Sequence, residues 1–237
     1  MNPETKQEIY REGSKVYDAA GAAIMTFTPI NRIHQHLCAF HIYAQDHTRH
    51  VEAHHFCSHR SKDFHQCVIY DSDAADARLI GIEYIVSEKA RRAQAVFKSL
   101  PEDEKIYWHS HKYEVESGIL YMETKGIVPA AVNDTAEEPA MLELHQTYGK
   151  TIHTWAYDQS PELPLGPPQL MMSYTHDNQA SEEVIRRRDE RSGISSSAKK
   201  ELREGYLPPY QKDNKADQWE KSGTGIVFKP EEVQIQK

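Results

Sequence analysis

The stretch Leu79-Ile-Gly-Ile-Glu-Tyr-Ile-Val86 is the most apolar part of this 237-residue chain. Short apolar runs rich in β-branched and aromatic residues are typical of strands. Two segments that precede it have the same character, and polar turns separate the three: His50-Val-Glu-Ala-His-His-Phe-Cys57 and Phe64-His-Gln-Cys-Val-Ile-Tyr70. We therefore predict three neighbouring strands, with a well-marked turn at Asp71-Ser-Asp73 before the last.

Helices are predicted on both sides of these strands. Thr28 can cap a helix and Pro29 fits its first turn, and this helix would carry one apolar stripe, made of Ile30, Ile33, Leu37, Phe40 and Ala44. Further along, we predict helices within 87–100, after 133–135 and over about 181–191, and strands over 113–122 and 151–157. This mixture favours the α+β class: a single domain around a mostly antiparallel sheet, with flanking helices and a polar C-terminal arm.

The domain boundaries follow changes in composition along the chain. We expect an N-terminal segment over residues 1–27, the domain over 28–193 and the arm over 194–237. Serines, Pro208-Pro209 and scattered charges in this last part predict an arm that lies on the surface or is partly disordered.

Composition excludes several classes of partner and compartment. The formal net charge is −8, from 28 basic and 36 acidic residues, and no basic stripe precedes residue 180, so we do not expect nucleic acid as a partner. No apolar run approaches the roughly 20 residues that cross a bilayer, and the N-terminus has no signal-peptide core. Three cysteines, an odd number, argue for a soluble cytoplasmic protein, with Cys57 and Cys67 as small core residues.

Histidines carry the strongest chemical signal, because all 14 lie between His34 and His176. In Trp108-His-Ser-His-Lys-Tyr-Glu-Val-Glu116, the histidines at 109 and 111 would share one face of a strand. A carboxylate from Glu114 or Glu116 would complete a metal triad of two nitrogens and one oxygen. The pair is similar to the histidine-x-histidine element of cupin metal sites, although the glycine spacing of cupins is missing. The alternative is that one histidine caps a helix and the other is solvated.

A second cluster lies in the first predicted strand. Alternation places Glu52 and His54 on one face and His55 and Cys57 on the other. We prefer His54, with Glu52, as a further metal ligand, and expect His55 to be a buried histidine hydrogen-bonded to backbone.

Glu83 interrupts the most apolar strand, and a buried carboxylate needs a partner. That partner is either a metal shared with the histidines or an arginine such as Arg78 or Arg49. His153 lies on the same predicted face as two aromatic side chains, Trp155 and Tyr157. This face either lines an apolar pocket with one polar group or forms an ordinary aromatic core.

Common catalytic motifs are missing from the sequence. We find no phosphate-binding glycine loop, no nucleophile elbow, no H-E-x-x-H and no dinucleotide fingerprint. Nucleotide-dependent chemistry and serine hydrolysis are therefore disfavoured.

Five segments, in matching order between about Thr28 and Gly193, together resemble the oil body-associated protein family. They are Val51-Glu-Ala-His-His-Phe-Cys57, Gln66-Cys-Val-Ile-Tyr-Asp71, Leu79 to Ser87, Trp108-His-Ser-His111 with Tyr113-Glu-Val115, and Leu163-Pro-Leu-Gly-Pro-Pro-Gln-Leu-Met-Met-Ser173. The resemblance implies association with lipid droplets but no established reaction, cofactor or catalytic residues. The chain lacks the apolar hairpin of oleosins, so such contact would be peripheral.

Three functional hypotheses follow. The first is a family member with a divalent transition metal (iron, zinc or similar) on His54, His109 and His111, with Glu83, Glu114 and His153 as catalytic groups acting on a small apolar molecule. The second is a non-catalytic accessory protein of the lipid-droplet surface. The third is a metal-free enzyme that uses histidine and glutamate as acid and base. Whether the chain forms a homo-oligomer stays open.

Overall fold

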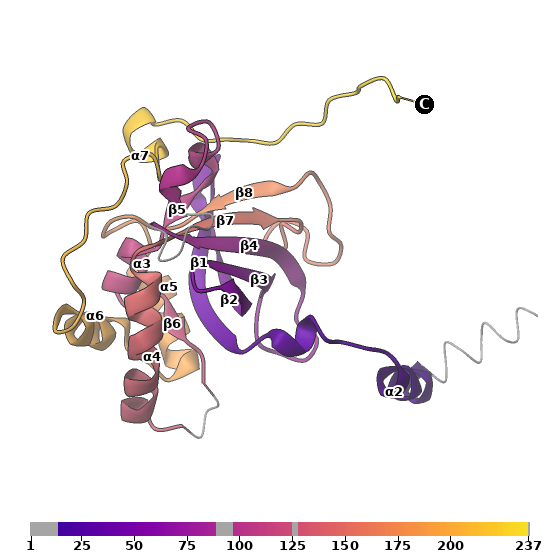
Figure 1. Ribbon diagram of the computed structural model, residues 1–237, viewed down its shortest axis with the longest axis horizontal. Helices are drawn as coiled ribbons and strands as arrows, with labels where there is room; N and C mark the ends of the chain where they lie inside the picture. Colours follow the sequence, from indigo (N-terminus) through magenta and orange to yellow (C-terminus); the bar gives the residue numbers. More distant parts are fainter. Residues whose placement is uncertain (1–13, 89–96, 125–127, 237) are drawn as a thin grey trace, which may run out of the picture. The chain divides into compact units, whose positions relative to one another are not determined.

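The computed structural model describes residues 14–88, 97–124 and 128–236. The chain divides into two compact units between His34 and Gln35. The first unit contains helix α2 (Ser14–Ile24) and the short 3-10 helix η1 (Ile30–Arg32). The second unit contains the sheet and the remaining helices, and Figure 1 shows both units with their element labels.

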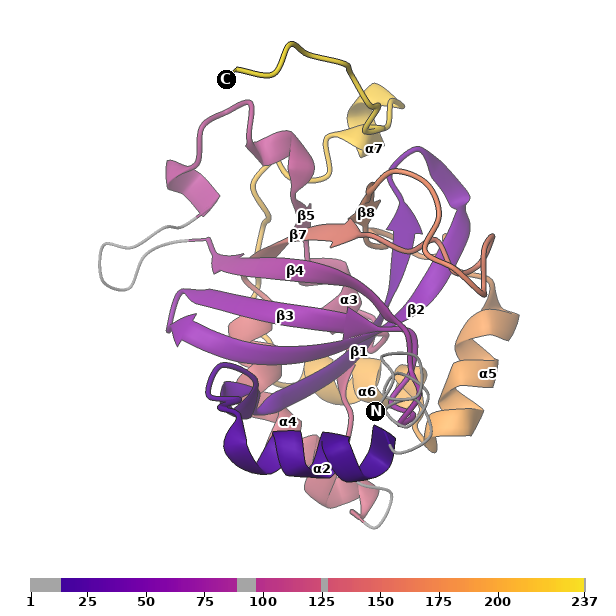
Figure 2. The same cartoon turned by 90° about the vertical axis from the view of Figure 1, so that its right-hand side faces the viewer.

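In the described residues of the second unit, eight strands form one antiparallel sheet that closes on itself. Strand β1 pairs with β2 on one side and with β8 and β6 on the other, so the path through β2, β3, β4, β7 and β8 returns to β1. Strand β5 adds to β7, and Figure 2 shows β3, β4 and β7 side by side. The strands are β1 (Gln35–Tyr43), β2 (Asp46–Ser61), β3 (Phe64–Tyr70), β4 (Leu79–Ser87), β5 (His109–Ser110), β6 (Tyr121–Met122), β7 (Thr147–His153) and β8 (Gln169–Met172). The α+β class with an antiparallel sheet is confirmed.

The three strands predicted around Leu79–Ser87 are present as β2, β3 and β4. On β4, Glu83 and Ile85 are buried whereas Ile82 and Tyr84 are exposed. This alternation, with a period of two, turns one face of the strand into the interior of the closed sheet.

The helix predicted from Thr28 to Ala44 is wrong. Only Ile30–Arg32 forms a helical turn, and β1 begins at Gln35. Strand β1 is buried on both faces from Leu37 to Tyr43, so its apolar residues are nearly continuous and match helical spacing by chance. The consequence is that His41 lies on a strand and belongs to the sheet.

The segment predicted as one strand over 113–122 is instead helix α3 (Lys112–Glu116) followed by β6. Gly118 separates them with a φ of +78°, and a Cβ there would lie 2.1 Å from the Ser196 carbonyl oxygen, so a bulkier residue does not fit.

Helix α4 (Ala130–Leu144) begins before the predicted 133–135 start and ends before Tyr148 and Gly149, which belong to β7. Strand β7 in turn ends at His153 rather than at Tyr157. The predicted helix within 87–100 lies largely outside the described residues, which show the 3-10 helices η2 (Phe97–Ser99) and η3 (Lys105–Tyr107) in this region.

The charged helix is present as α5 (Glu182–Ser192), capped by the Ser181 side chain. The polar arm that follows contains α6 (Ser196–Glu204) and α7 (Trp219–Ser222). It is not confined to the surface, because the buried Arg203 guanidinium donates to the carbonyls of Val115 and Leu120. Helices α3, α4 and α6 group on one side of the sheet (Figure 1).

Cys57 and Cys67 face each other on β2 and β3 and form a disulfide. Both are buried core residues, as expected, but they are bonded to each other, and Cys38 is the one free cysteine among the described residues. Because disulfides persist in oxidising surroundings, this pair does not support the cytoplasmic compartment inferred from the cysteine count. In the described part of the chain, no helix is both long and apolar enough to span a bilayer.

Candidate metal centre

The carboxylate of Glu83 lies at the centre of a histidine cluster inside the closed sheet. Glu83 projects inward from β4, His55 from β2, and His109 from β5, while His111 directly precedes α3. All four side chains are buried. The topology thus brings together residues that are up to 56 positions apart in the chain, from 55 to 111.

Three imidazole nitrogens face this one carboxylate. The Nε2 atoms of His109 and His111 lie 3.4 and 3.3 Å from Glu83 Oε1, and His55 Nε2 lies 3.1 Å from Glu83 Oε2. Ligand atoms of Glu83, His109 and His111 lie within 4.8 Å of one another, and so do those of Glu83, His55 and His41. Two groups with metal-ligand chemistry therefore share Glu83.

The tautomer of His111 follows from its other nitrogen. Thr147 Oγ donates its only proton to the Leu144 carbonyl at 2.7 Å, so it can only accept from His111 Nδ1, 2.8 Å away. The proton of neutral His111 therefore sits on Nδ1, and the lone pair of Nε2 points toward Glu83 Oε1. Two acceptors facing each other in a buried site need a proton or a cation between them.

Two further histidines extend the cluster. His41 Nε2 lies 3.1 Å from His55 Nε2, and His41 Nδ1 lies 2.9 Å from His153 Nε2. Both rings are buried. His153, which the sequence offered as a catalytic group, therefore connects to Glu83 through His41 and His55 and does not contact it directly.

Burial and charge shift the pKa values of this cluster in opposite directions. Burial raises the pKa of Glu83, but favourable interactions with His109 and His55 outweigh it and hold that pKa well below its usual range. Burial lowers the pKa of His109, yet attraction to Glu83 leaves it raised. At His111 burial dominates and the pKa is lowered. The carboxylate is thus ionised and His111 is neutral, the forms in which they bind a metal, whereas the raised pKa of His109 favours its protonated form until a metal displaces the proton.

Close packing at Gly149 permits this arrangement. Gly149 lies on β7 between Ile85 and His109. A Cβ at this position would lie 2.0 Å from Glu83 Oε1 and 2.8 Å from His111 Nε2. Glycine is therefore required at this position because the Glu83 and His111 side chains approach the backbone closely. It does not end a helix, as its place in the sequence had suggested.

A cavity of about 10 Å³ borders the site. Polar groups of the site and Glu114 form one part of its wall. The rest of the wall is apolar and consists of Leu37, Ala39, Ile85, Leu120 and Leu144. This volume corresponds to about one water-sized sphere. Burial raises the pKa of Glu114 to about 7, and attraction to His109 offsets this only in part.

The C-terminal arm holds the histidine-x-histidine segment in place. Ser110 N, between the two histidines, donates to both carboxylate oxygens of Asp217 at 3.3 Å. Asp217 N in turn donates to the Trp108 carbonyl at 3.2 Å. A residue more than 100 positions away in sequence thereby fixes the backbone that carries His109 and His111.

The predicted site is assembled in part. Glu83, His109 and His111 converge, and Glu114 lines the adjacent cavity. Glu116 instead contacts His145 and Lys112. The arginine alternative for Glu83 is wrong, because Arg78 pairs with Asp71 and Arg49 with Asp158.

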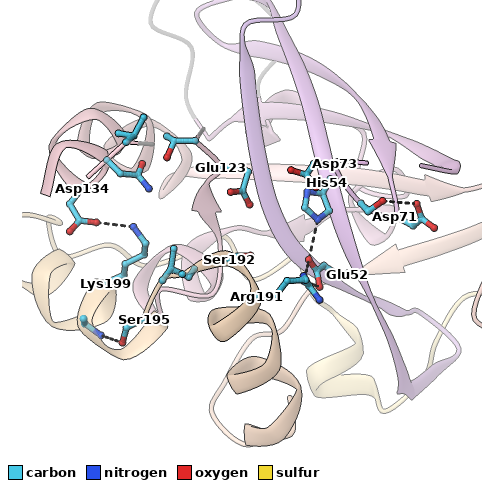
Figure 3. Close-up of a pocket in the computed structure, with 17 residues that line it drawn as sticks. Glu52, His54, Asp71, Asp73, Glu123, Asp134, Arg191, Ser192, Ser195 and Lys199 are labelled. Carbon is cyan, nitrogen blue, oxygen red and sulfur yellow. Dashed lines mark hydrogen bonds and ion pairs between the residues drawn. The ribbon is translucent and has the colours of Figure 1, made fainter. Parts of the chain in front are cut away.

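His54 lies on the opposite face of β2 and does not join this cluster. As predicted, it shares its face with Glu52, whose Oε1 lies 3.0 Å from His54 Nε2. Together with Cys38 these two form a separate group of ligand atoms within 4.8 Å. Figure 3 shows His54 and Glu52 at the wall of a different, larger cavity.

Sequence reasoning missed His41 and His55. Alternation correctly placed His54 and His55 on opposite faces, but β2 is buried on both faces at this point, so the pattern carried no signal for choosing between them. His41 was missed because its segment was read as a helix. A correct strand assignment for 35–43 would have offered His41 as a candidate.

Comparison with known proteins agrees with the resemblance seen in the sequence. The family model described as "Protein of unknown function (DUF1264)" matches residues 27–206. Oil body-associated protein 1B of Arabidopsis thaliana is 44% identical over 201 residues, covering 85% of this chain and 78% of the relative. Oil body-associated protein 1A of Zea mays is 44% identical over 203 residues, with 86% and 80% coverage. Oil body-associated protein 2A of Zea mays is 38% identical over 225 residues, with 93% and 84% coverage.

No solved structure gives a significant match to the chain. The family assignment therefore rests on the family model and on these relatives, each of which the chain covers over more than three quarters of its length. On this evidence the chain belongs to the oil body-associated protein family.

Proposed function

We propose that this protein binds a divalent transition metal inside its closed sheet, through Glu83, His109 and His111, while His55 contacts the other carboxylate oxygen of Glu83. The observation that carries the proposal is the convergence of three Nε2 atoms on one buried carboxylate, at 3.1 to 3.4 Å. His54, favoured by the sequence, lies on the other face of β2 and has no part in this proposal.

The spacing of the donors supports a metal rather than simple hydrogen bonding. Ligands about 2.0–2.1 Å from a tetrahedral ion lie about 3.3–3.4 Å from one another. The distances from Glu83 Oε1 to His109 and His111 fall in this range. Ordinary N–H···O hydrogen bonds are shorter, with a mode near 2.9–3.0 Å.

The chemistry of the donors narrows the choice of metal. Imidazole nitrogens with one carboxylate suit zinc and iron, whereas calcium and magnesium prefer all-oxygen sites. The bond from His111 Nδ1 to Thr147 is the outer-shell contact that fixes a ligating histidine. Two histidines and one carboxylate also form the facial triad of non-haem iron sites.

The neighbouring cavity limits what this site accepts. Its volume of about 10 Å³ and mostly apolar wall suit one small ligand, such as a water molecule. In a reaction, Glu114 would exchange a proton with that ligand, and His153 would act through His41. A larger apolar molecule would have to displace the side chains of Leu120 and Leu144.

Metal analysis of purified protein tests this proposal. We expect about one equivalent of zinc or iron per chain, and its loss in the His109→Ala/His111→Ala variant. The matched control is His54→Ala, another buried histidine, which should keep the metal. Metal content that is well below one equivalent and unchanged by the double substitution would contradict the proposal.

We further propose that the first unit contacts the lipid-droplet surface peripherally. The relatives are named oil body-associated, and this unit exposes five large apolar side chains within fifteen positions, by 43 to 86%: Val16, Ile24, Met25, Phe27 and Ile30. Apolar residues on a short amphipathic segment insert at a lipid surface without spanning it.

Localisation of the full-length protein, fused to a fluorescent protein, tests this second proposal. Ile24→Asp with Phe27→Asp should move the fusion off droplets. Thr26→Asp with Thr28→Asp adds the same charge to neighbouring polar positions and should leave it there. Equal localisation of both variants would remove the proposed contact.

A further inference from the structure

A second and much larger cavity lies on the other side of β2 from the metal centre. Its volume is about 850 Å³. Figure 3 shows its wall, which is formed by β2, the turn after β3, the segment after β6, and helices α4 to α6. Because His54 and His55 point to opposite faces of β2, this cavity and the metal centre are separate sites.

The wall of this cavity carries more negative than positive charge. Five carboxylates line it, against two cationic side chains: Glu52, Asp71, Asp73, Glu123 and Asp134, with Arg191 and Lys199. Three of the carboxylates are neutralised, since Glu52 pairs with Arg191, Asp134 with Lys199, and Asp71 with Arg78.

Asp73 and Glu123 are left without a cationic partner among the described residues. Glu123 accepts a hydrogen bond from the Tyr121 hydroxyl, which does not neutralise it. His36 lies near Asp73, but burial lowers the pKa of this histidine to about 4, so it is neutral at physiological pH. In Figure 3 the carboxylate of Glu123 faces His54 and Asp73 across the cavity.

An independent observation points to a ligand. Asn133, on α4, lines the cavity and is only 7% exposed. Its Oδ1 has no hydrogen-bond partner within the described parts of the chain. A buried acceptor without a donor costs about 1–3 kcal/mol, and a bound donor would remove this cost.

We propose that this cavity binds a linear aliphatic amine with at least two primary ammonium groups. Asp73, Glu123 and the Asn133 Oδ1 atom are acceptors left open on its wall, and the two carboxylates are negatively charged, so these groups select a cationic hydrogen-bond donor. Asp73 and Glu123 join no group of three His, Cys, Asp or Glu ligand atoms within 4.8 Å in the described residues, so a single metal ion does not satisfy them. Two ammonium groups spaced along an aliphatic chain can pair with both carboxylates.

The lining also argues against quaternary ammonium ligands. Proteins recognise such ligands with cages of aromatic rings, and no Phe, Tyr or Trp is among the described residues that line the cavity. A quaternary nitrogen also has no proton to donate to Asn133.

Isothermal titration of the full-length protein with spermidine tests the proposal. We expect binding at one site per chain, about 10-fold or more weaker in Asn133→Leu and in Glu123→Gln. Asn133→Asp, which adds a charge at the orphaned acceptor, should bind more tightly. Glu190→Gln is the matched control: it removes a carboxylate from α5 that pairs with Arg186 outside the cavity, and it should bind as the wild type does.

Three probes separate the proposed chemistry from simpler causes. n-Butylamine, with one ammonium group, and hexamethonium, with two quaternary groups, should each bind at least about 10-fold more weakly than spermidine, and Mg²⁺ should not compete at equal ionic strength. Equal binding of either amine, displacement by Mg²⁺, or affinities unaffected by the Asn133 and Glu123 substitutions would overturn the proposal. If Asn133→Leu does not fold, as judged by circular dichroism, Asn133→Asp and Glu123→Gln decide the question.

Discussion

Glu83 combines a full negative charge with complete burial, and three histidines compensate for it. Sequence reasoning identified Glu83 because a carboxylate in an apolar strand needs a partner, and it identified His109 and His111 from their spacing. It did not identify His55, because local alternation does not show which face of a doubly buried strand turns inward. That choice is made by the closure of the sheet.

Glu83→Gln should weaken metal binding more than it weakens the fold. The amide keeps the shape and can donate to His111 Nε2, while the buried charge is lost. We expect zinc affinity to fall by more than the roughly 10–100-fold typical of outer-shell changes, with a melting temperature of the metal-free protein near the wild-type value. Competition with a chelator measures the affinity. Unchanged zinc affinity would show that Glu83 is not a ligand.

Thr147→Val should weaken metal binding through His111 alone. The isosteric change removes the acceptor that fixes the His111 tautomer, and such outer-shell losses cost roughly 10–100-fold in affinity. Thr151→Val is the matched control, since this hydroxyl is also buried on β7 but has no hydrogen-bond partner in the described residues. The same chelator competition should find Thr151→Val close to wild type; equal effects of both changes would contradict the role of Thr147.

At the scale of elements, β2, β3 and β4 could be predicted because their short apolar runs and turns are local features. Strand β1 and helix α3 could not, because their identities depend on burial by distant segments: β1 is covered on both faces, and α3 packs near α6 through Gly118 and Ser196. The hydrogen bonds between Asp217 of the arm and the histidine-x-histidine segment are likewise long-range contacts, which the polar sequence of the arm does not reveal.

Gly149 lies on β7, where β4 and β5 pair with this strand from opposite sides, and its close packing yields a prediction at this scale. Gly149→Ala places a methyl group 2.0 Å from Glu83 Oε1, so the strands must separate or the carboxylate must turn away. We expect a loss of about 1–3 kcal/mol in the free energy of unfolding together with loss of metal. Urea denaturation and metal analysis measure the two effects, and a stable variant that keeps its metal would show that the packing is looser than described.

The link between β2 and β3 gives a second prediction. The disulfide from Cys57 to Cys67 spans ten positions, and a loop of this length contributes about 2–3 kcal/mol of stability in the chain-entropy description. Reducing agent should therefore lower the free energy of unfolding of the wild type by this amount. It should have no effect on Cys57→Ser/Cys67→Ser, and an equal response of both proteins would exclude the bond as the cause.

For the whole molecule, the closed sheet explains why the chemistry was only partly visible in the sequence. Closure makes one interior from strands that begin at residue 35 and end at residue 172, so Glu83 of β4, His55 of β2 and the histidines at 109 and 111 meet without any continuous motif. The same closure separates the two faces of β2, with a nitrogen-rich centre inside and a carboxylate-rich cavity outside. The polar arm and helices complete the second unit and hold the histidine-x-histidine segment.

The most direct test is a crystal structure of the zinc-loaded protein with anomalous data collected at the zinc edge. The metal proposal predicts one strong peak inside the closed sheet, about 2.0–2.1 Å from Glu83, His109 and His111. No peak at this position, or peaks only beside His54 or beside the stacked pair of the exposed His59 and the buried His65, would contradict it.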